Sequence, residues 1–104
     1  MSGPWLVDVA PELVPELERL LTQAGEGALA HQVAGLRLHD RCRCGDDFCA
    51  AFYTAPRQIR PGSLGIPLEV ERGLLIVIVD RNEIVEIEAL YRPDLRTRIH
   101  AAIP

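Results

Sequence analysis

Residues 74–90 read LLIVIVDRNEIVEIEAL, two apolar runs separated by a short polar turn. The first run, residues 74–79, is apolar on both faces, which is typical of a central strand that is covered on both sides of the sheet. Asn82 tolerates the left-handed backbone conformation that a tight turn needs. The stretch therefore predicts an antiparallel hairpin in which Val79 pairs with Ile84.

That register predicts how the side chains of the hairpin divide between the two faces of the sheet. Successive side chains of a strand point to opposite faces. One face is then expected to be wholly apolar, and to carry Ile76, Ile78, Val85 and Ile87. Glu86 and Glu88 are expected on the other, solvent-facing side.

Helical periodicity flanks the hairpin on both sides. Residues 11–24 predict an amphipathic helix whose regular part begins at Pro15 and which Gly25 ends. A shorter helix is expected from about Glu26 to Ala34. Pro93, at a favoured first helical position, opens a last helix.

Between these helices the sequence alternates in the manner of strands. Strands are expected at residues 36–44, 48–54 and 68–79, with the Pro- and Gly-rich residues 56–67 as an irregular connection. Together with the strand after the turn, this predicts an α+β fold: a four-stranded, mainly antiparallel sheet with two N-terminal helices and one C-terminal helix. The whole chain, residues 1–104, is expected to be a single domain.

Composition narrows the classes of function. The chain of 104 residues is 48% apolar and 25% charged, with a net charge of −4 that disfavours nucleic acid and anionic membranes as partners. It offers neither a signal peptide nor an apolar run of about 18 residues, so we expect a cytoplasmic protein without a membrane segment. Phosphate-binding loops, nucleophile elbows and metalloprotease motifs are absent from the sequence, which indicates a protein that is not an enzyme.

All three cysteines fall within eight residues, as Cys42-Arg43-Cys44-Gly45-Asp46-Asp47-Phe48-Cys49. Cys42 and Cys44 share a face by the period of two, and closing the loop at 45–48 places Cys44 opposite Cys49. The three thiols are therefore expected to converge. Because Leu36 and Leu38 would share their face, we expect this face to point into the core.

Convergent thiols admit three interpretations. The first is a zinc site in which Cys42, Cys44 and Cys49 need a fourth ligand: His39 if a β-bulge turns it inward, Asp40, or His31 or His100 from a helix. The second is ordinary core packing, since free cysteine is a small and often buried side chain. The third is thiol redox chemistry, including a reversible Cys44–Cys49 disulfide, although no C-x-x-C motif is present.

Charged faces provide the remaining candidates for recognition. Arg41 and Arg43 alternate with the cysteines and form a basic strand face, which could contact phosphate or a partner. Glu86 and Glu88, with two further glutamates at 69 and 71, would steer a basic protein towards the sheet.

Two segments carry a resemblance. The run from Gly73 to Ile99, with its Asp-Arg-Asn-Glu turn and Arg92-Pro93-Asp94-Leu95-Arg96 helix start, resembles small bacterial proteins from GC-rich, actinobacterial-type genomes, as does the segment from Arg41 to Cys49. Such proteins carry no established activity. The resemblance implies a fold and a bacterial origin, and it transfers no catalytic residue.

These observations lead to one main hypothesis and two alternatives. The main hypothesis is a small cytoplasmic, non-catalytic module that binds another protein, of the immunity or regulatory type, through Glu86, Glu88, Arg41 and Arg43. In the first alternative zinc stabilises the domain through the three cysteines and His39. In the second the chain is a thiol-redox protein.

Overall fold

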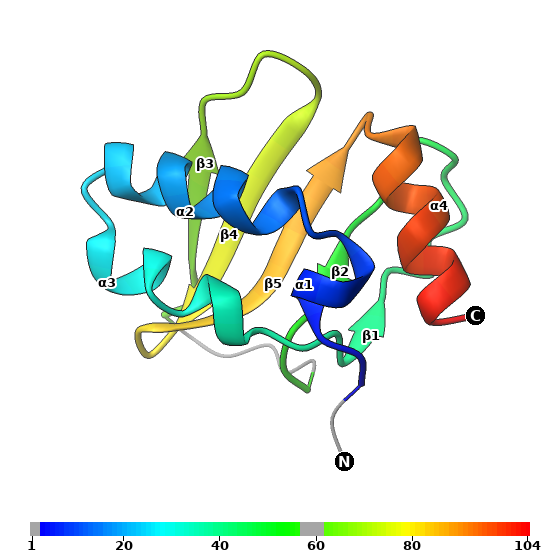
Figure 1. Ribbon diagram of the computed structural model, residues 1–104, viewed down its shortest axis with the longest axis horizontal. Helices are drawn as coiled ribbons and strands as arrows, with labels where there is room; N and C mark the ends of the chain where they lie inside the picture. The colour runs from blue at the N-terminus through cyan, green and yellow to red at the C-terminus, as the bar shows by residue number, and fades with distance from the viewer. Residues whose placement is uncertain (1–2, 57–61) are drawn as a thin grey trace.

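The computed structural model describes residues 3–56 and 62–104, which form one antiparallel sheet with helices packed on one of its faces (Figure 1). The strands are β1 (Asp40–Arg41), β2 (Phe52–Tyr53), β3 (Leu64–Leu68), β4 (Leu74–Asp80) and β5 (Glu83–Leu90), in the spatial order β1-β2-β5-β4-β3. The helices are α1 (Leu6–Val9), α2 (Leu13–Gln23), α3 (Gly27–Ala30), α4 (Pro93–Ala102) and the 3₁₀ turn η1 (Val33–Gly35). The predicted α+β class is confirmed. Its detail differs, because the described residues hold five strands and four α-helices instead of four and three.

The core lies between the sheet and the helices. Phe52, Val77 and Ile87 come from three neighbouring strands and are fully buried, as are Leu17 of α2 and Ile99 of α4. In Figure 1, α2 crosses in front of the sheet while α4 lies at the end where β1 and β2 are. Residues of β4 alternate between buried and half-buried. β4 lies between β5 and β3 in the sheet, but only one of its faces is fully covered, so the predicted cover on both faces is wrong.

The turn of the β4–β5 hairpin is as predicted, but the distribution of side chains along it is not. Val79 pairs with Ile84, and a β-bulge follows at once, so that Ile78 pairs with Glu86 and not with Val85. A bulge gives one strand an extra residue and moves every later side chain to the opposite face. The prediction that one face of the hairpin is wholly apolar is therefore wrong. Val77 faces the core with Ile87, whereas the face that carries Ile76 and Ile78 also carries Glu88 and Glu86.

Two polar side chains hold the bulged turn in place. Gln32 accepts a hydrogen bond from the Ile84 N–H at 3.0 Å and donates to the Asn82 carbonyl at 2.6 Å. Thr54 donates its backbone N–H to the Val85 carbonyl and its hydroxyl to the Ile84 carbonyl. Backbone groups of Asn82, Ile84 and Val85, at the turn and the bulge, thus have hydrogen-bond partners outside the β4–β5 pair.

The predicted strand at 68–79 is interrupted: Leu68 ends β3, residues 69–73 belong to no strand, and β4 begins at Leu74. Leu68 of β3 pairs with Leu75 of β4, and Gly73 turns the chain between them with φ of +73°. Pro67 lies in β3, at the edge of the sheet, where the missing N–H of proline is tolerated. The predicted irregular connection therefore contains a strand at its end, and its residues 57–61 lie outside the described part of the chain.

At the N-terminus the helix predicted at 11–24 is confirmed as α2, which begins at Leu13, two residues before the predicted start of its regular part. The helix expected at 26–34 is divided into α3 and η1. α1 was not predicted. Its single turn follows a bridge between Trp5 and Arg37 and ends at the buried Ala10.

The hairpin predicted at 36–54 keeps its register but loses most of its length. Asp40 pairs with Tyr53 and Arg41 with Phe52, and the same register extrapolates to Cys44 opposite Cys49. Regular pairing nevertheless covers two residues on each strand. The preceding segment pairs with the N-terminus instead, since the Leu38 N–H donates to the Pro4 carbonyl at 2.8 Å.

Candidate metal centre

The residues between β1 and β2 form a tight excursion from the sheet. The Cys42 N–H donates to the Ala51 carbonyl at 2.9 Å, which is the last hydrogen bond shown in the β1–β2 register. Gly45 then adopts φ of +84°, a conformation that L side chains rarely take. The Cys49 N–H donates to the Asp46 carbonyl at 3.2 Å and closes the turn. The chain therefore reverses within a few residues and returns Cys49 towards Cys42.

The returning limb is held by the end of β5. Cys49 forms an isolated bridge with Leu90, and the Ala50 N–H donates to the Ala89 carbonyl at 2.8 Å. On the other side of Cys49, the Phe48 carbonyl accepts the Tyr91 N–H at 2.8 Å, and the two aromatic rings stack with centroids 5.3 Å apart. Cys49 is thus fixed by the sheet rather than by the turn alone.

This arrangement brings the three thiols together. The Sγ atoms of Cys42, Cys44 and Cys49 all lie within 4.8 Å of one another, so the predicted convergence is confirmed and the group could hold a metal ion. The prediction that their face points into the core is wrong in part. Cys49 is buried, Cys42 is half-buried and Cys44 is exposed, because the turn at 42–49 extends past the end of the regular sheet. Core packing does not account for an exposed cysteine.

The environments of the two opposed cysteines differ in their effect on pKa. At Cys44 the backbone N–H of Asp46 donates to the sulfur and lowers the pKa of the thiol, and the Cys42 side chain adds to this. At Cys49, burial raises the pKa to about 11. In the metal-free protein Cys44 is therefore the more readily ionised thiol, and exposure makes it the more accessible one.

A pocket of about 280 Å³ opens beside the thiols, and α4 forms its far wall. All three cysteines line it, together with Arg96 and His100 of that helix. The Arg96 Nε is buried and has no hydrogen-bond partner, an unusual state for a charged donor. Burial lowers the pKa of His100, and the nearby Arg41 guanidinium lowers it further. Both effects disfavour the charged imidazolium and favour the neutral imidazole, which is the form that binds metal ions.

Two arginines predicted to form a free basic face instead tie the cysteine segment to α4. Arg41 donates from Nε to the Ile103 carbonyl at 2.7 Å and from Nη2 to the Pro104 carbonyl at 2.8 Å. Arg43 donates to the same Pro104 oxygen at 3.2 Å and forms an ion pair with Asp40 at 3.0 Å. The acceptors are the oxygens of the two residues that follow the last residue of α4, Ala102, so the bonds fix the chain just beyond the end of that helix.

The remaining predicted ligands lie apart from the thiols. His39 is exposed, and no bulge turns it towards the pocket. The Arg41 N–H donates to the Asp40 carboxylate at 2.8 Å, and this bond lowers the pKa of that carboxyl. His31 is exposed at the end of α3. Of the ligands considered from the sequence, His100 is the one that shares the pocket with the cysteines.

Three thiolates at this spacing suit a soft or borderline metal ion. A zinc ion bound at about 2.3 Å from each sulfur holds tetrahedral sulfur atoms about 3.8 Å apart. The observed separations, within 4.8 Å, need to close by about 1 Å at most. Side-chain rotation alone can supply such a movement, because Cys44 is exposed.

No match is found. Comparison with family models, with curated proteins and with solved structures links this chain to none of them. The chemistry of the described residues must therefore carry the functional argument. Among these residues, no helix is long and apolar enough to cross a bilayer.

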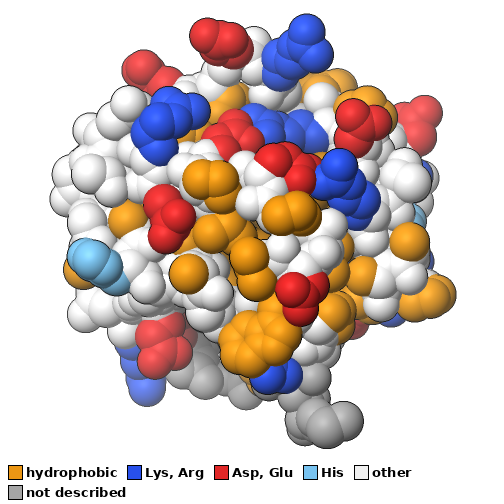
Figure 2. Space-filling model, in the orientation of Figure 1, with side chains coloured by type: hydrophobic (Ala, Val, Ile, Leu, Met, Phe, Trp, Pro, Cys, Tyr) orange, Lys and Arg blue, Asp and Glu red, His pale blue; other side chains and the backbone are white. Residues whose placement is uncertain are grey.

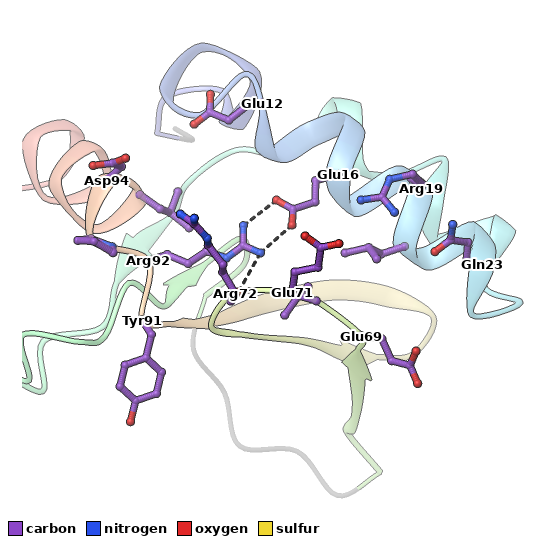
Figure 3. Close-up of a pocket in the computed structure, with 14 residues that line it drawn as sticks. Glu12, Glu16, Arg19, Gln23, Glu69, Glu71, Arg72, Tyr91, Arg92 and Asp94 are labelled. Atoms are coloured by element: carbon purple, nitrogen blue, oxygen red, sulfur yellow. Dashed lines mark hydrogen bonds and ion pairs between the residues drawn. The ribbon is translucent and has the colours of Figure 1, made fainter.

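A second concave feature, a cleft of about 850 Å³, lies between α2 and the start of α4. In Figure 2, which has the orientation of Figure 1, acidic and basic side chains are intermixed along the top of the molecule. Arg92 donates to both carboxylate oxygens of Glu16 at 2.6 and 2.7 Å, and Figure 3 shows this pair in the middle of the cleft. Sequence reasoning missed the pair, because the two residues are 76 positions apart.

The glutamates predicted to act together are divided between two places. Glu69 and Glu71 line the cleft, and Figure 3 shows them on the segment that follows β3. Glu86 and Glu88 are half-buried on β5, on the sheet face opposite the helices. A single acidic array across the sheet is therefore not what the fold presents.

Proposed function

We propose that this chain is a small metal-binding domain in which Cys42, Cys44 and Cys49 bind a zinc ion that stabilises the fold. One observation carries the proposal, namely the convergence of three Sγ atoms to within 4.8 Å from both limbs of one turn. Two of these thiols are not buried, so the cluster is not explained by hydrophobic packing.

The surroundings of the thiols support a bound cation held by anionic ligands. Three thiolates and Zn²⁺ carry a net charge of −1. Arg41, Arg43 and Arg96 line the same pocket and stabilise that charge. The buried Arg96 Nε, which lacks a partner, is suited to donate to a thiolate sulfur, as the outer shell of a metal site commonly does.

A structural role follows from where the ligands are placed. Cys42 continues β1, whereas Cys49 is fixed against the end of β5. An ion between them closes a turn whose regular strand pairing is only two residues long on each side. A metal ion that binds only the folded state stabilises that state.

The test is the dependence of stability on zinc. Free zinc at a hundred times its dissociation constant adds about 2.7 kcal/mol to the free energy of unfolding. For a domain of this size that raises the melting temperature by about 10–20 °C. Cys44→Ser should abolish the rise and, because Cys44 is exposed, leave the metal-free melting temperature nearly unchanged. An equal response of wild type and variant to zinc or to a chelator would reject the proposal.

Non-catalytic protein binding is the second candidate function. The observation in its favour is the imbalance of charge around the cleft, where five carboxylates accompany three guanidinium groups. The stacked pair of Phe48 and Tyr91 is exposed, and Tyr91 lies on the rim. Aromatic faces and carboxylates together suit a basic peptide.

The binding of a labelled arginine-rich peptide, measured by anisotropy at low and high salt, tests this candidate. The double variant Glu69→Gln/Glu71→Gln should weaken binding, whereas Glu83→Gln, a change at the exposed start of β5, should not. Equal binding by wild type and the double variant would refute a role for the cleft.

A further inference from the structure

Zinc in a structural site takes four ligands in a tetrahedron. The described residues bring three thiols within range of one another, which leaves one position of the tetrahedron open. The open position must be filled by water or by a side chain that reaches the same pocket. Identifying that side chain shows how the metal connects with the rest of the fold.

Two side chains other than the thiols line the pocket and have a metal-ligating atom, the imidazole of His100 and the carboxylate of Asp46. Asp46 lies in the exposed turn, two residues beyond Cys44. His100 is half-buried in the third turn of α4. An imidazole nitrogen is the commonest partner of thiolates in structural zinc sites, where Cys₃His sets are well established.

The orientation of α4 directs His100 to the pocket. Ile99, the preceding residue, is fully buried against the sheet. Arg96 lies one helical turn before His100 and therefore on the same face of the helix, and both line the pocket. The helix end is fixed as well, because Arg41 holds the Ile103 and Pro104 carbonyls. His100 thus lines the pocket of the thiols from an element that is already anchored to the cysteine segment.

The geometry points to His100 as the fourth ligand of a Cys₃His zinc centre that joins the cysteine turn to α4. This inference rests on the proposed zinc site and adds the residue that completes it. Its consequence is structural: the metal connects β1, the end of β5 and the C-terminal helix. The three thiols lie within 4.8 Å of one another and His100 shares their pocket, so a movement of the His100 side chain towards the thiols would complete the set of four donors.

The test is the first coordination shell of the zinc-loaded protein, read by X-ray absorption at the zinc edge. The expected shell for wild type is three sulfur atoms and one nitrogen atom. His100→Ala should lose the nitrogen and raise the zinc dissociation constant, measured by competition with a chromophoric chelator, at least tenfold. His100→Cys should restore affinity and give a shell of four sulfur atoms.

Two matched variants serve as controls. His39→Ala removes an exposed imidazole outside the pocket, and Asp46→Asn removes the competing carboxylate. Both should leave the dissociation constant within about twofold, since neither residue binds the ion in this account. Far-ultraviolet circular dichroism of the metal-free variants reports whether each one is folded.

The outcomes distinguish a failure of the His100 assignment from a failure of the proposed zinc binding. If the wild type takes up no zinc, the proposed function fails and the inference fails with it. If the wild type binds zinc with three sulfur atoms and one oxygen atom, and His100→Ala keeps its affinity, only the assignment of His100 is overturned. Loss of affinity in Asp46→Asn would transfer the fourth position to that carboxylate.

Discussion

Replacing Glu16 with glutamine tests the ion pair that joins α2 to the start of α4. Arg92 donates to both carboxylate oxygens of Glu16, and the two side chains are only 18% and 24% exposed. Removing one partner of a fully buried pair costs about 3–5 kcal/mol, whereas an exposed pair contributes about 0–1 kcal/mol. At this partial burial we expect Glu16→Gln to destabilise the protein by about 2 kcal/mol.

The assay is urea unfolding, with thermal melting as a second measurement. A loss of about 2 kcal/mol lowers the melting temperature of a domain of this size by about 8–16 °C. Glu12→Gln is the matched control, because Glu12 forms an ion pair with Arg98 of α4, and these two side chains are 59% and 44% exposed. That change should cost less than about 1 kcal/mol. A Glu16→Gln effect no larger than that of Glu12→Gln would mean that the Glu16–Arg92 pair contributes no more than an exposed ion pair.

Four further predictions concern the turns and the thiols. Gly73→Ala should destabilise the protein by about 1 kcal/mol more than Gly25→Ala. Both glycines have positive φ, but of the two only Gly73 lies where an added Cβ would clash with backbone, at the Leu90 carbonyl. Equal losses of stability in urea unfolding would contradict the clash. Arg81→Asn should stabilise the β4–β5 turn by about 0.5–1 kcal/mol, since Arg81 has φ of +52°, and an unchanged urea midpoint would count against it. In the metal-free protein, iodoacetamide should modify Cys44 first and Cys49 last. Because burial raises the pKa of Cys49 from about 9 to about 11, the contribution of this thiol to stability is complete below about pH 9 and is lost as the pH rises through about 11. Mass spectrometry after a short iodoacetamide pulse checks the order of modification, and Cys49 reacting before Cys44 would contradict it. Unfolding at about pH 8 and about pH 11 checks the dependence of stability on pH.

The local parts of the fold could be predicted from the sequence, and their relative placement could not. The Val79–Ile84 pairing follows from the turn residues, and the register that sets Cys44 against Cys49 follows from loop length. Both depend on neighbours a few positions apart. The bulge at Val85 depends instead on Thr54, which binds the released carbonyls from another strand. No periodicity within residues 83–90 reports that partner.

In the candidate site, too, contacts between residues near in sequence could be predicted and contacts between distant residues could not. Convergence of the thiols was a consequence of strand alternation and is confirmed by their separations. Their burial was not predictable in the same way, because the turn at 42–49 extends beyond the sheet. The nearest histidine in sequence, His39, is exposed, whereas His100, 51 positions beyond Cys49, lines the pocket. Arg41 fixes the chain at this end of α4 by hydrogen bonds to Ile103 and Pro104, the two residues after the helix.

Whether the three cysteines bind zinc is decided by the metal content of the tag-free protein, purified without added metal, together with a count of the thiols that react under native conditions. We expect about one zinc ion per chain and protection of Cys42, Cys44 and Cys49. Removal of the metal by a chelator should then make Cys44 reactive first. A protein that contains no metal, takes up no zinc when it is supplied, and has a freely reactive Cys44 from the outset would show that the cysteines are not a zinc site.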